Sequence, residues 1–252
     1  MAKIALITGA TSGIGEATAH VFARERYNVI LTGRRLDRLE KLATSINKEY
    51  NVEVAICAFD VRDRAEVISN LENLPAEWKK VNVLVNNAGL SQGLDPIQTG
   101  NMDDWDTMID TNVKGLLYVS RIVSPWMIHN GYGHIINIGS IAGKEVYPNG
   151  NVYCASKAAV DSLSKAMRLD LLSHGIKVTA VHPGAAETEF AMVRFKGDKE
   201  RAKKTYEGFE PLVAEDIAET IWFAASRPPH VNINELVVMA TAQGSANHFY
   251  RK

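Results

Sequence analysis

The sequence predicts an α/β fold, a single domain in which one parallel sheet of seven strands has helices on both faces. Strand-length apolar runs alternate with amphipathic stretches along the chain, a pattern typical of right-handed crossovers and a parallel sheet. The runs are rich in Val and Ile and carry few charges, as strands covered on both faces do. No low-complexity linker or short-period repeat divides the 252 residues.

The expected strands lie at 3–8, 28–33, 52–59, 81–87, 134–139, 177–183 and 235–240. Helices are expected between them at 13–25, 36–49, 63–73, 103–130, 151–174 and 214–226. The stretch 36–49 shows why: its apolar positions recur at three- and four-residue steps, which indicates one apolar stripe of a helix. These positions are Leu36, Leu39, Leu42, Ala43 and Ile46.

The segment 184–213 is irregular, because it is charged and Pro211 interrupts it. An insertion of this length between a strand and a helix is more often a functional lid than filler. We therefore expect a substrate-binding loop here, with a disorder-prone loop as the alternative.

Composition excludes several classes of protein. The formal net charge of −1 argues against a nucleic-acid or acidic-membrane partner. No stretch approaches the ~20 apolar residues of a membrane span, and the first apolar run breaks at Thr8-Gly9, too soon for a signal peptide. Cys57 and Cys154 lack metal-ligand spacing. We expect reduced thiols in a cytoplasmic protein with no metal.

A glycine-rich loop follows the first strand and begins the first helix. Gly9, Gly13 and Gly15 allow a tight turn, a close approach of the backbone to a pyrophosphate, and close packing of helix on strand. Free N–H groups at the helix N-terminus favour phosphate. The pattern therefore predicts a dinucleotide site, although its spacing differs from the commonest fingerprint.

The end of the second strand predicts which dinucleotide is bound. A carboxylate that holds the ribose of NAD is usual about 20 residues after the loop. Here the chain has Arg34 and Arg35 instead, and guanidinium groups pair well with a 2′-phosphate. We predict NADP rather than NAD; the alternative is that both arginines only solvate the helix entry.

Further motifs follow the other strands, at the edge of the sheet where ligands bind in open α/β folds. With these motifs, the chain resembles the short-chain dehydrogenase/reductase family over essentially its whole length. The residues that carry the resemblance are Thr8-Gly9-x-x-x-Gly13-x-Gly15, Asn86-Asn87-Ala88-Gly89, Asn112, Ser140, Tyr153-x-x-x-Lys157, and Pro183-Gly184 with Thr188. The resemblance implies a Rossmann-type doubly wound sheet, a nicotinamide cofactor and a homotetramer.

The same resemblance implies the catalytic roles. Tyr153 would be the general acid–base, and Ser140 would hold the substrate oxygen against it. Lys157, one helical turn from Tyr153, and the positive nicotinamide would lower the phenol pKa from its usual value near 10. Lys157 would also bind the nicotinamide ribose, and Asn112 would hold a water of the proton relay. The alternatives are structural. Tyr153 and Lys157 could be an ordinary helix-surface pair, Ser140 only a strand-end cap, and Asn112 a buried asparagine satisfied by backbone.

The resemblance also extends the cofactor site. Asp60 and Val61 would contact the adenine, although Asp60 or Asp63 could instead cap a helix, and Thr188 would meet the nicotinamide carboxamide. The full expected cofactor set is Gly9, Thr11, Ser12, Gly13, Ile14, Gly15, Arg34, Arg35, Asp60, Val61, Asn87, Ala88, Gly89, Tyr153, Lys157, Pro183, Gly184 and Thr188.

Longer stretches such as "LPAEWKKVNVLVNNAGL" and "PPHVNINELVVM" are similar to the NADP-dependent 3-hydroxy acid dehydrogenases of the family, which oxidise L-serine, L-allo-threonine and related acids. A carboxylate substrate needs a cationic anchor, and Arg194 could clamp it. We predict Ser140, Tyr153 and Arg194 as substrate contacts. The alternative is that the charges of this segment are simply solvated.

Two other functions stay open from sequence. One is an NADPH-dependent reductase of neutral ketones, aldehydes or 3-ketoacyl thioesters. The other is a non-catalytic NADP-binding redox sensor, against which Ser140, Tyr153 and Lys157 argue, because a sensor needs no proton-transfer residues.

Overall fold

The strands form one parallel sheet in the order β3-β2-β1-β4-β5-β6-β7. The computed structural model describes residues 2–252, and its seven strands confirm the expected ones to within two residues at each end. They are β1 Ile4–Ile7, β2 Asn28–Gly33, β3 Val54–Ala58, β4 Val81–Asn86, β5 His134–Ile138, β6 Lys177–Pro183 and β7 Glu235–Val238.

The helices follow the strands in alternation. They are α1 Gly13–Arg24, α2 Leu36–Tyr50, α3 Arg64–Glu72, α4 Met102–Ile109, α5 Leu116–Asn130, α6 Asn151–Asp170, α7 Phe190–Arg194, α8 Lys199–Tyr206 and α9 Ala214–Ala225. Short helical turns add η1 Ala76–Lys79, η2 Asp110–Gly115, η3 Ile141–Gly143 and η4 Leu172–His174. None of the helices described over residues 2–252 combines the length and apolarity needed to cross a membrane.

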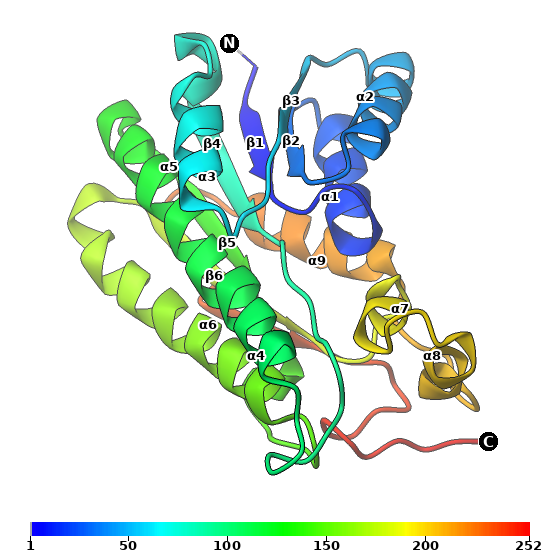
Figure 1. The fold of residues 1–252 in the computed structure, drawn as a ribbon. Helices are drawn as coiled ribbons and strands as arrows, with labels where there is room; N and C mark the ends of the chain where they lie inside the picture. The colour runs from blue at the N-terminus through cyan, green and yellow to red at the C-terminus, as the bar shows by residue number, and fades with distance from the viewer. Residues whose placement is uncertain (1) are drawn as a thin grey trace.

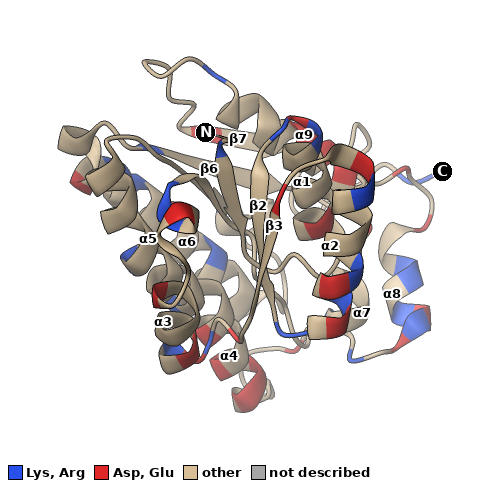
Figure 2. Cartoon of the chain, turned by 90° about the horizontal axis from the view of Figure 1, so that it is seen from above, with Lys and Arg blue, Asp and Glu red and all other residues tan. Residues whose placement is uncertain are grey.

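Helices cover the two faces of the sheet (Figure 1), and an apolar cluster lies on each face. α1, α2 and α9 pack on one face, against side chains such as Ile7 and Val29. α3 and α5 pack on the other, against neighbours such as Leu6 and Ile30. Because successive strand residues point to opposite faces, burial on both sides requires the nearly continuous apolar runs of the sequence. Charged residues gather on outer helices such as α2 and α8 (Figure 2).

Two expectations about helices need correction. The helix expected at 103–130 is divided, because a π-helical turn, η2, separates α4 from α5. Leu36 was expected on the apolar stripe of α2 but is 48% exposed, whereas Leu39, Leu42 and Ile46 are buried. Leu36 is the first residue of the helix, and the buried stripe begins one turn later, at Leu39.

The segment 184–213 is more ordered than the sequence indicated. It contains α7 and α8, separated by a turn in which Lys196 and Gly197 have positive φ. Its ends are fixed by backbone hydrogen bonds between Glu187 and Leu212 and between Leu212 and Ala185. The disorder-prone alternative is therefore wrong.

Candidate active site

A cavity of about 720 Å³ lies at the carboxyl ends of β1, β4, β5 and β6, with α7 and the C-terminal segment at its side. The strand order reverses between β1 and β4, and ligands bind at such a switch point in open α/β sheets. Of the residues predicted for the site, Gly15 and Asn112 alone do not line this cavity. The fold thus brings together strand ends, the glycine loop and the insertion 184–213.

The glycine-rich loop leaves β1 and turns into α1. Gly9 and Gly13 have φ of +67° and +54°, which favours glycine. Gly15 lies behind the cavity, where an added Cβ would meet the Gly9 carbonyl oxygen at 2.3 Å. The close packing of helix on loop therefore requires glycine at this position. The backbone at the start of α1 lines the cavity and is a cradle that suits a pyrophosphate.

A second loop, after β4, is tied to the first. The Thr8 hydroxyl accepts hydrogen bonds from the backbone N–H groups of Asn87 and Ala88 at 3.0 and 2.9 Å. The Asn87 side chain donates to the carbonyl oxygens of Thr8 and Gly9 at 2.9 and 3.2 Å. Asn87 therefore fixes the shape of the glycine loop.

Cations gather at the end of β2. Arg35 donates to the Thr11 hydroxyl at 2.7 Å and to the Ser12 hydroxyl at 2.9 Å, so it does more than solvate the helix entry. Its other nitrogen pairs with Glu189 at 3.0 Å. Arg38, which the sequence analysis missed, also pairs with Glu189, at 2.7 Å. The charge and the fork geometry of these arginines fit a 2′-phosphate.

Arg34 and the loop after β3 complete this end of the cavity. Arg34 lies 3.8 Å from Asp60, and Arg62 pairs with the same carboxylate at 2.6 Å. These arginines oppose burial and hold the pKa of Asp60 below its usual value. Asp60 and Val61 line the cavity. The helix cap considered for Asp60 is supplied by Asp63, which accepts from two backbone N–H groups of α3.

Tyr153 and Lys157 lie on the first turns of α6, 8% and 5% exposed. The Lys157 ammonium donates to the Ile138 carbonyl at 2.8 Å. The Ser140 hydroxyl accepts from the Ala142 N–H at 3.1 Å and donates to the Pro183 carbonyl at 3.5 Å. Ser140, Tyr153 and Lys157 all line the cavity, so a ligand could contact these groups together.

Burial shifts the two pKa values in opposite directions, because it disfavours each charged form. It lowers the pKa of Lys157 to about 8. It raises the pKa of Tyr153, and the nearby Tyr147 adds to this, while Ser140 and Arg194 act in the opposite direction. Lys157 is directed to a carbonyl and contributes nothing to these shifts of the Tyr153 pKa. The lowering expected when the positive nicotinamide is bound stays a prediction.

Asn112 lies in the π-helical turn, a feature frequent at functional sites. Its amide donates to the Leu90 carbonyl at 2.8 Å and to the Ser156 hydroxyl at 3.0 Å, and its oxygen accepts from the Leu90 N–H at 2.8 Å. Asn112 thus joins the loop after β4 to α6, as the alternative of a satisfied buried asparagine expected. Its water-relay role stays a prediction.

Arg194 comes from α7 and lies beside Tyr153 and Ser91. Its Nε donates to the Ser91 hydroxyl at 3.0 Å and its Nη2 to the Tyr147 hydroxyl. Its guanidinium lies 5.2 Å from the centre of the Tyr153 ring and 5.4 Å from that of Phe190. The solvated alternative is wrong for Arg194, but it describes Lys196, which is exposed and pairs with Asp104 at 2.9 Å.

The sequence analysis missed Ser91, Tyr147 and Phe190. Ser91 lies two residues after the Asn-Asn-Ala-Gly motif. This closeness to the motif is the one feature of the sequence that could have indicated it. Tyr147 and Ser91 lie 47 and 103 residues from Arg194. No local periodicity links residues so far apart.

The loop after β6 lies across the cavity. Thr188 accepts from the Phe190 N–H at 3.2 Å, and its Cβ would lie 3.2 Å from a Cβ added at Gly13. Gly184 packs against Gln243, whose oxygen accepts from the Ala185 N–H at 2.8 Å. Gln243, which the sequence analysis also missed, therefore holds the Pro183-Gly184 turn in place.

Comparison with known proteins gives concordant matches. A family model described as "short chain dehydrogenase" matches residues 3–199. A Salmonella typhi protein named NADP-dependent 3-hydroxy acid dehydrogenase is 47% identical, covering 96% of this chain and 97% of that one. A Chromohalobacter salexigens protein named sulfoacetaldehyde reductase 2 is also 47% identical, covering 96% of both chains.

Solved structures agree. A closed form of serine dehydrogenase complexed with NADP+ is 45% identical with a TM-score of 0.92, over 99% of both chains. Serine dehydrogenase from Escherichia coli is 41% identical with a TM-score of 0.81, over 96% of this chain and 99% of that one. The seven-stranded parallel sheet is the fold of these neighbours.

Proposed function

The chain belongs to the short-chain dehydrogenase family, and from this premise we propose an NADP-dependent oxidoreductase of small 3-hydroxy acids. The family match confirms the family predicted from the sequence. Members of this family act on hydroxyl groups or the corresponding carbonyls. The proposed substrates are of the L-serine, L-allo-threonine and 3-hydroxypropionate type. The observation that carries the substrate class is the position of Arg194 against the Tyr153 ring.

The cofactor would lie along the cavity from Arg35 to Lys157. Arg34, Arg35 and Arg38 would hold a 2′-phosphate, and the N-terminus of α1 would hold the pyrophosphate. Lys157 and Thr188 would contact the nicotinamide half. When bound, NADP would accept or supply the hydride at the carbinol carbon and place a positive charge near Tyr153.

The protein's own residues handle the proton. The Tyr153 phenol would take the hydroxyl proton of the substrate during oxidation and return it during reduction. Ser140 would donate to the substrate oxygen and hold it beside the phenol. Lys157, whose pKa burial lowers to about 8, can exchange a proton near neutral pH, which suits a relay through the Asn112 region.

Arg194 would bind the substrate carboxylate. Its Nε and Nη2 are held by Ser91 and Tyr147, so its remaining N–H groups stay in a fixed orientation for a bidentate partner. The guanidinium stacks near the ring that carries the reacting hydroxyl. The anionic group must therefore lie only a few bonds from the carbinol carbon, as it does in a 3-hydroxy acid.

A second candidate is an aldehyde that carries a sulfonate. The relative named sulfoacetaldehyde reductase 2 is as similar to this chain as the relative named 3-hydroxy acid dehydrogenase. A guanidinium pairs with either anion. Neutral ketones gain nothing from Arg194, and they rank below both.

We further propose a homotetramer, as the family resemblance implies, and a cytoplasmic location, which the two free cysteines favour. The exposed side chains Leu117, Leu169 and Leu172 on or beside α5 and α6 support an interface on this face of the sheet. Calibrated light scattering on the active enzyme is the measurement, and a monomeric active species would contradict the tetramer.

The function is tested by initial rates of oxidation of L-serine and 3-hydroxypropionate, with NADP and NAD in parallel. The wild type is compared with Tyr153→Phe. We expect NADP-dependent turnover and a loss of about 10²–10⁴-fold in the variant, the size of a general acid–base contribution. Circular dichroism of both proteins controls for folding.

Each other outcome is informative. Turnover with NAD alone would contradict the assignment of the arginines. Reduction of sulfoacetaldehyde without oxidation of either acid would favour the second candidate. NADP binding without turnover of an acid, an anionic aldehyde or a neutral ketone would favour the redox sensor.

A further inference from the structure

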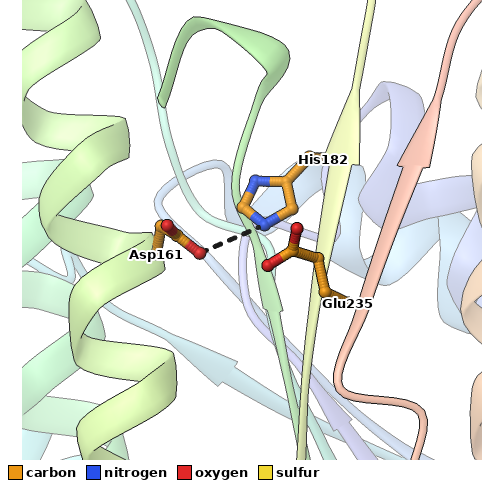
Figure 3. A group of neighbouring side chains, drawn as sticks. All are labelled: Asp161, His182 and Glu235. Atoms are coloured by element: carbon orange, nitrogen blue, oxygen red, sulfur yellow. Dashed lines mark ion pairs between the residues drawn. The ribbon is translucent and has the colours of Figure 1, made fainter. Parts of the chain in front are cut away.

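A cluster of charged groups lies behind the candidate active site, outside the cavity. Asp161 of α6, His182 of β6 and Glu235 of β7 converge there (Figure 3). Their ligand atoms lie within 4.8 Å of one another, and the His182 Nε2 is 3.6 Å from the Asp161 Oδ1. His182 is fully buried, and neither ring nitrogen has a hydrogen-bond partner within residues 2–252.

The cation of this cluster is a side chain of the protein. The Lys144 ammonium lies 2.9 Å from Asp161 and 2.8 Å from Glu235, between the two carboxylates that a metal ion would use. Each carboxylate holds the pKa of Lys144 above its usual value against the effect of burial. A metal would have to displace this ammonium, so the geometry favours an ion-pair network over a metal site.

Lys144 belongs to the loop that carries Ser140. Ser140 caps the short helical turn η3, and Lys144 is the next residue after that turn. Gly143 lies directly on α6, where an added Cβ would meet the Lys157 carbonyl oxygen at 2.5 Å. The loop from Ser140 to Lys144 therefore packs against α6 at Gly143, and the Lys144 ion pairs fix its far end.

The His182 ring packs against the start of the same loop. A Cβ added at Gly139 would lie 2.4 Å from the His182 Nδ1, so the ring fills the space under the residue that precedes Ser140. Asp161 lies four residues after Lys157 on α6, one helical turn further on. The cluster thus joins the Ser140 loop, the helix of Tyr153 and Lys157, and two strands of the sheet.

We propose that Lys144, Asp161 and Glu235 are positioning residues, whose ion pairs hold the Ser140 loop in register with the helix that carries Tyr153 and Lys157. This inference rests on the proposed function, because Ser140 matters only if Tyr153 transfers a proton. The network acts on the rate of the chemical step and leaves the dinucleotide contacts intact. Errors of about 1 Å in such a geometry can cost on the order of 10²-fold in rate.

The chain offers a matched control. Lys165 pairs with the other oxygen of Asp161 at 2.8 Å, but it is exposed and lies on α6 itself. Lys144→Met and Lys165→Met each remove one ammonium from the same carboxylate, and only the first releases the loop. The measurements are kcat and KM for the hydroxy acid, the NADP dissociation constant by fluorescence titration, and the melting temperature.

We expect Lys144→Met to lower kcat by about 10-fold, with the NADP dissociation constant within about twofold of wild type. Lys165→Met should leave both unchanged, and Lys144→Arg should restore most of kcat. Equal loss in Lys144→Met and Lys165→Met, or a wild-type kcat in Lys144→Met, would overturn the inference. A wild type without turnover would instead be a failure of the proposed function.

A second variant covers the case in which Lys144→Met does not fold. Glu235→Gln removes only the outer carboxylate, which is partly exposed on β7. It should lower kcat by about two- to fivefold with unchanged NADP affinity, since Asp161 still holds Lys144. A kcat equal to wild type in a folded Glu235→Gln protein would exclude Glu235 from the network.

Discussion

The glycine loop after β1 and the insertion 184–213 both border the cavity, but they are built in different ways. The loop depends on the conformation of its glycines: Gly9 and Gly13 turn the chain, and Gly15 lets α1 pack onto the Gly9 carbonyl. The Asn87 side chain then holds that conformation through the carbonyls of Thr8 and Gly9. Between the backbone hydrogen bonds at its ends, the insertion is held by side chains that reach distant elements. Glu189 pairs with Arg35, and Arg194 bonds to Ser91.

This difference indicates a division of labour. A backbone cradle is the same for every dinucleotide, because N–H groups at a helix N-terminus bind phosphate whatever the rest of the ligand. Side chains on an insertion can change without disturbing the sheet. We therefore expect damage to the loop to affect cofactor binding as a whole, and damage to the insertion to affect individual ligand groups.

The largest effect should come from the loop. In Gly15→Ala the new methyl would lie 2.3 Å from the Gly9 carbonyl oxygen and 2.5 Å from the Asn87 side chain, so both must move. We expect NADP affinity to fall by about 100-fold, equivalent to about 2.7 kcal/mol, or folding to fail. Fluorescence titration and thermal melting measure the two outcomes.

Gly244→Ala is its control, since the nearest atom to the added methyl is 3.5 Å away and no shift is needed. Unchanged NADP affinity in a folded Gly15→Ala protein would mean that the loop tolerates displacement. The glycine loop would then be as adaptable as the insertion, which contradicts the proposed difference between them.

The next effect should come from the insertion. Arg194→Ala removes the proposed carboxylate anchor, and a hydrogen bond to a charged group contributes about 1.5–3 kcal/mol. We expect KM for 3-hydroxypropionate to rise by about 10–100-fold, while rates with a neutral carbonyl compound stay near wild type. Steady-state kinetics on both substrates separate anchoring from structural damage.

Lys196→Ala is the matched control for Arg194→Ala. Lys196 carries the same charge two residues further on, but its exposed side chain pairs with the buried carboxylate of Asp104 and does not line the cavity. It should leave both substrates unaffected. Equal losses on acid and neutral compounds in Arg194→Ala would remove Arg194 from substrate recognition.

The smallest effect should come from the contact between the two regions. Arg35→Gln removes one cation from the proposed 2′-phosphate site, while Arg38 stays near it. We expect the NADP dissociation constant to rise by about 10-fold, or about 1.4 kcal/mol, with NAD binding within twofold of wild type. Arg24→Gln, which breaks a pair with Glu219 on an exposed surface, should change neither.

The outcome of Arg35→Gln can also refine the contrast. Parallel loss of NADP and NAD affinity would mean that Arg35 acts through its bonds to Thr11 and Ser12. Arg35 would then be part of the loop's support and would not select the cofactor.

The sequence by itself determined the sheet, the glycine loop and the pairing of Tyr153 with Lys157 on one helix. Each depends on neighbours within a few residues: apolar runs define strands, glycine defines tight turns, and a four-residue spacing defines a helix face. The order of these motifs along the chain was enough to identify the family.

Only the tertiary structure decided the setting of those residues. The contacts of Arg194 with Ser91 and Tyr147, and those of Lys144 with Asp161 and Glu235, join residues 17 to 103 positions apart. The sequence pattern likewise did not predict the π-helical turn at Asn112 or the raised pKa of Tyr153. Burial and long-range charge set these properties, and both depend on which distant segments pack together.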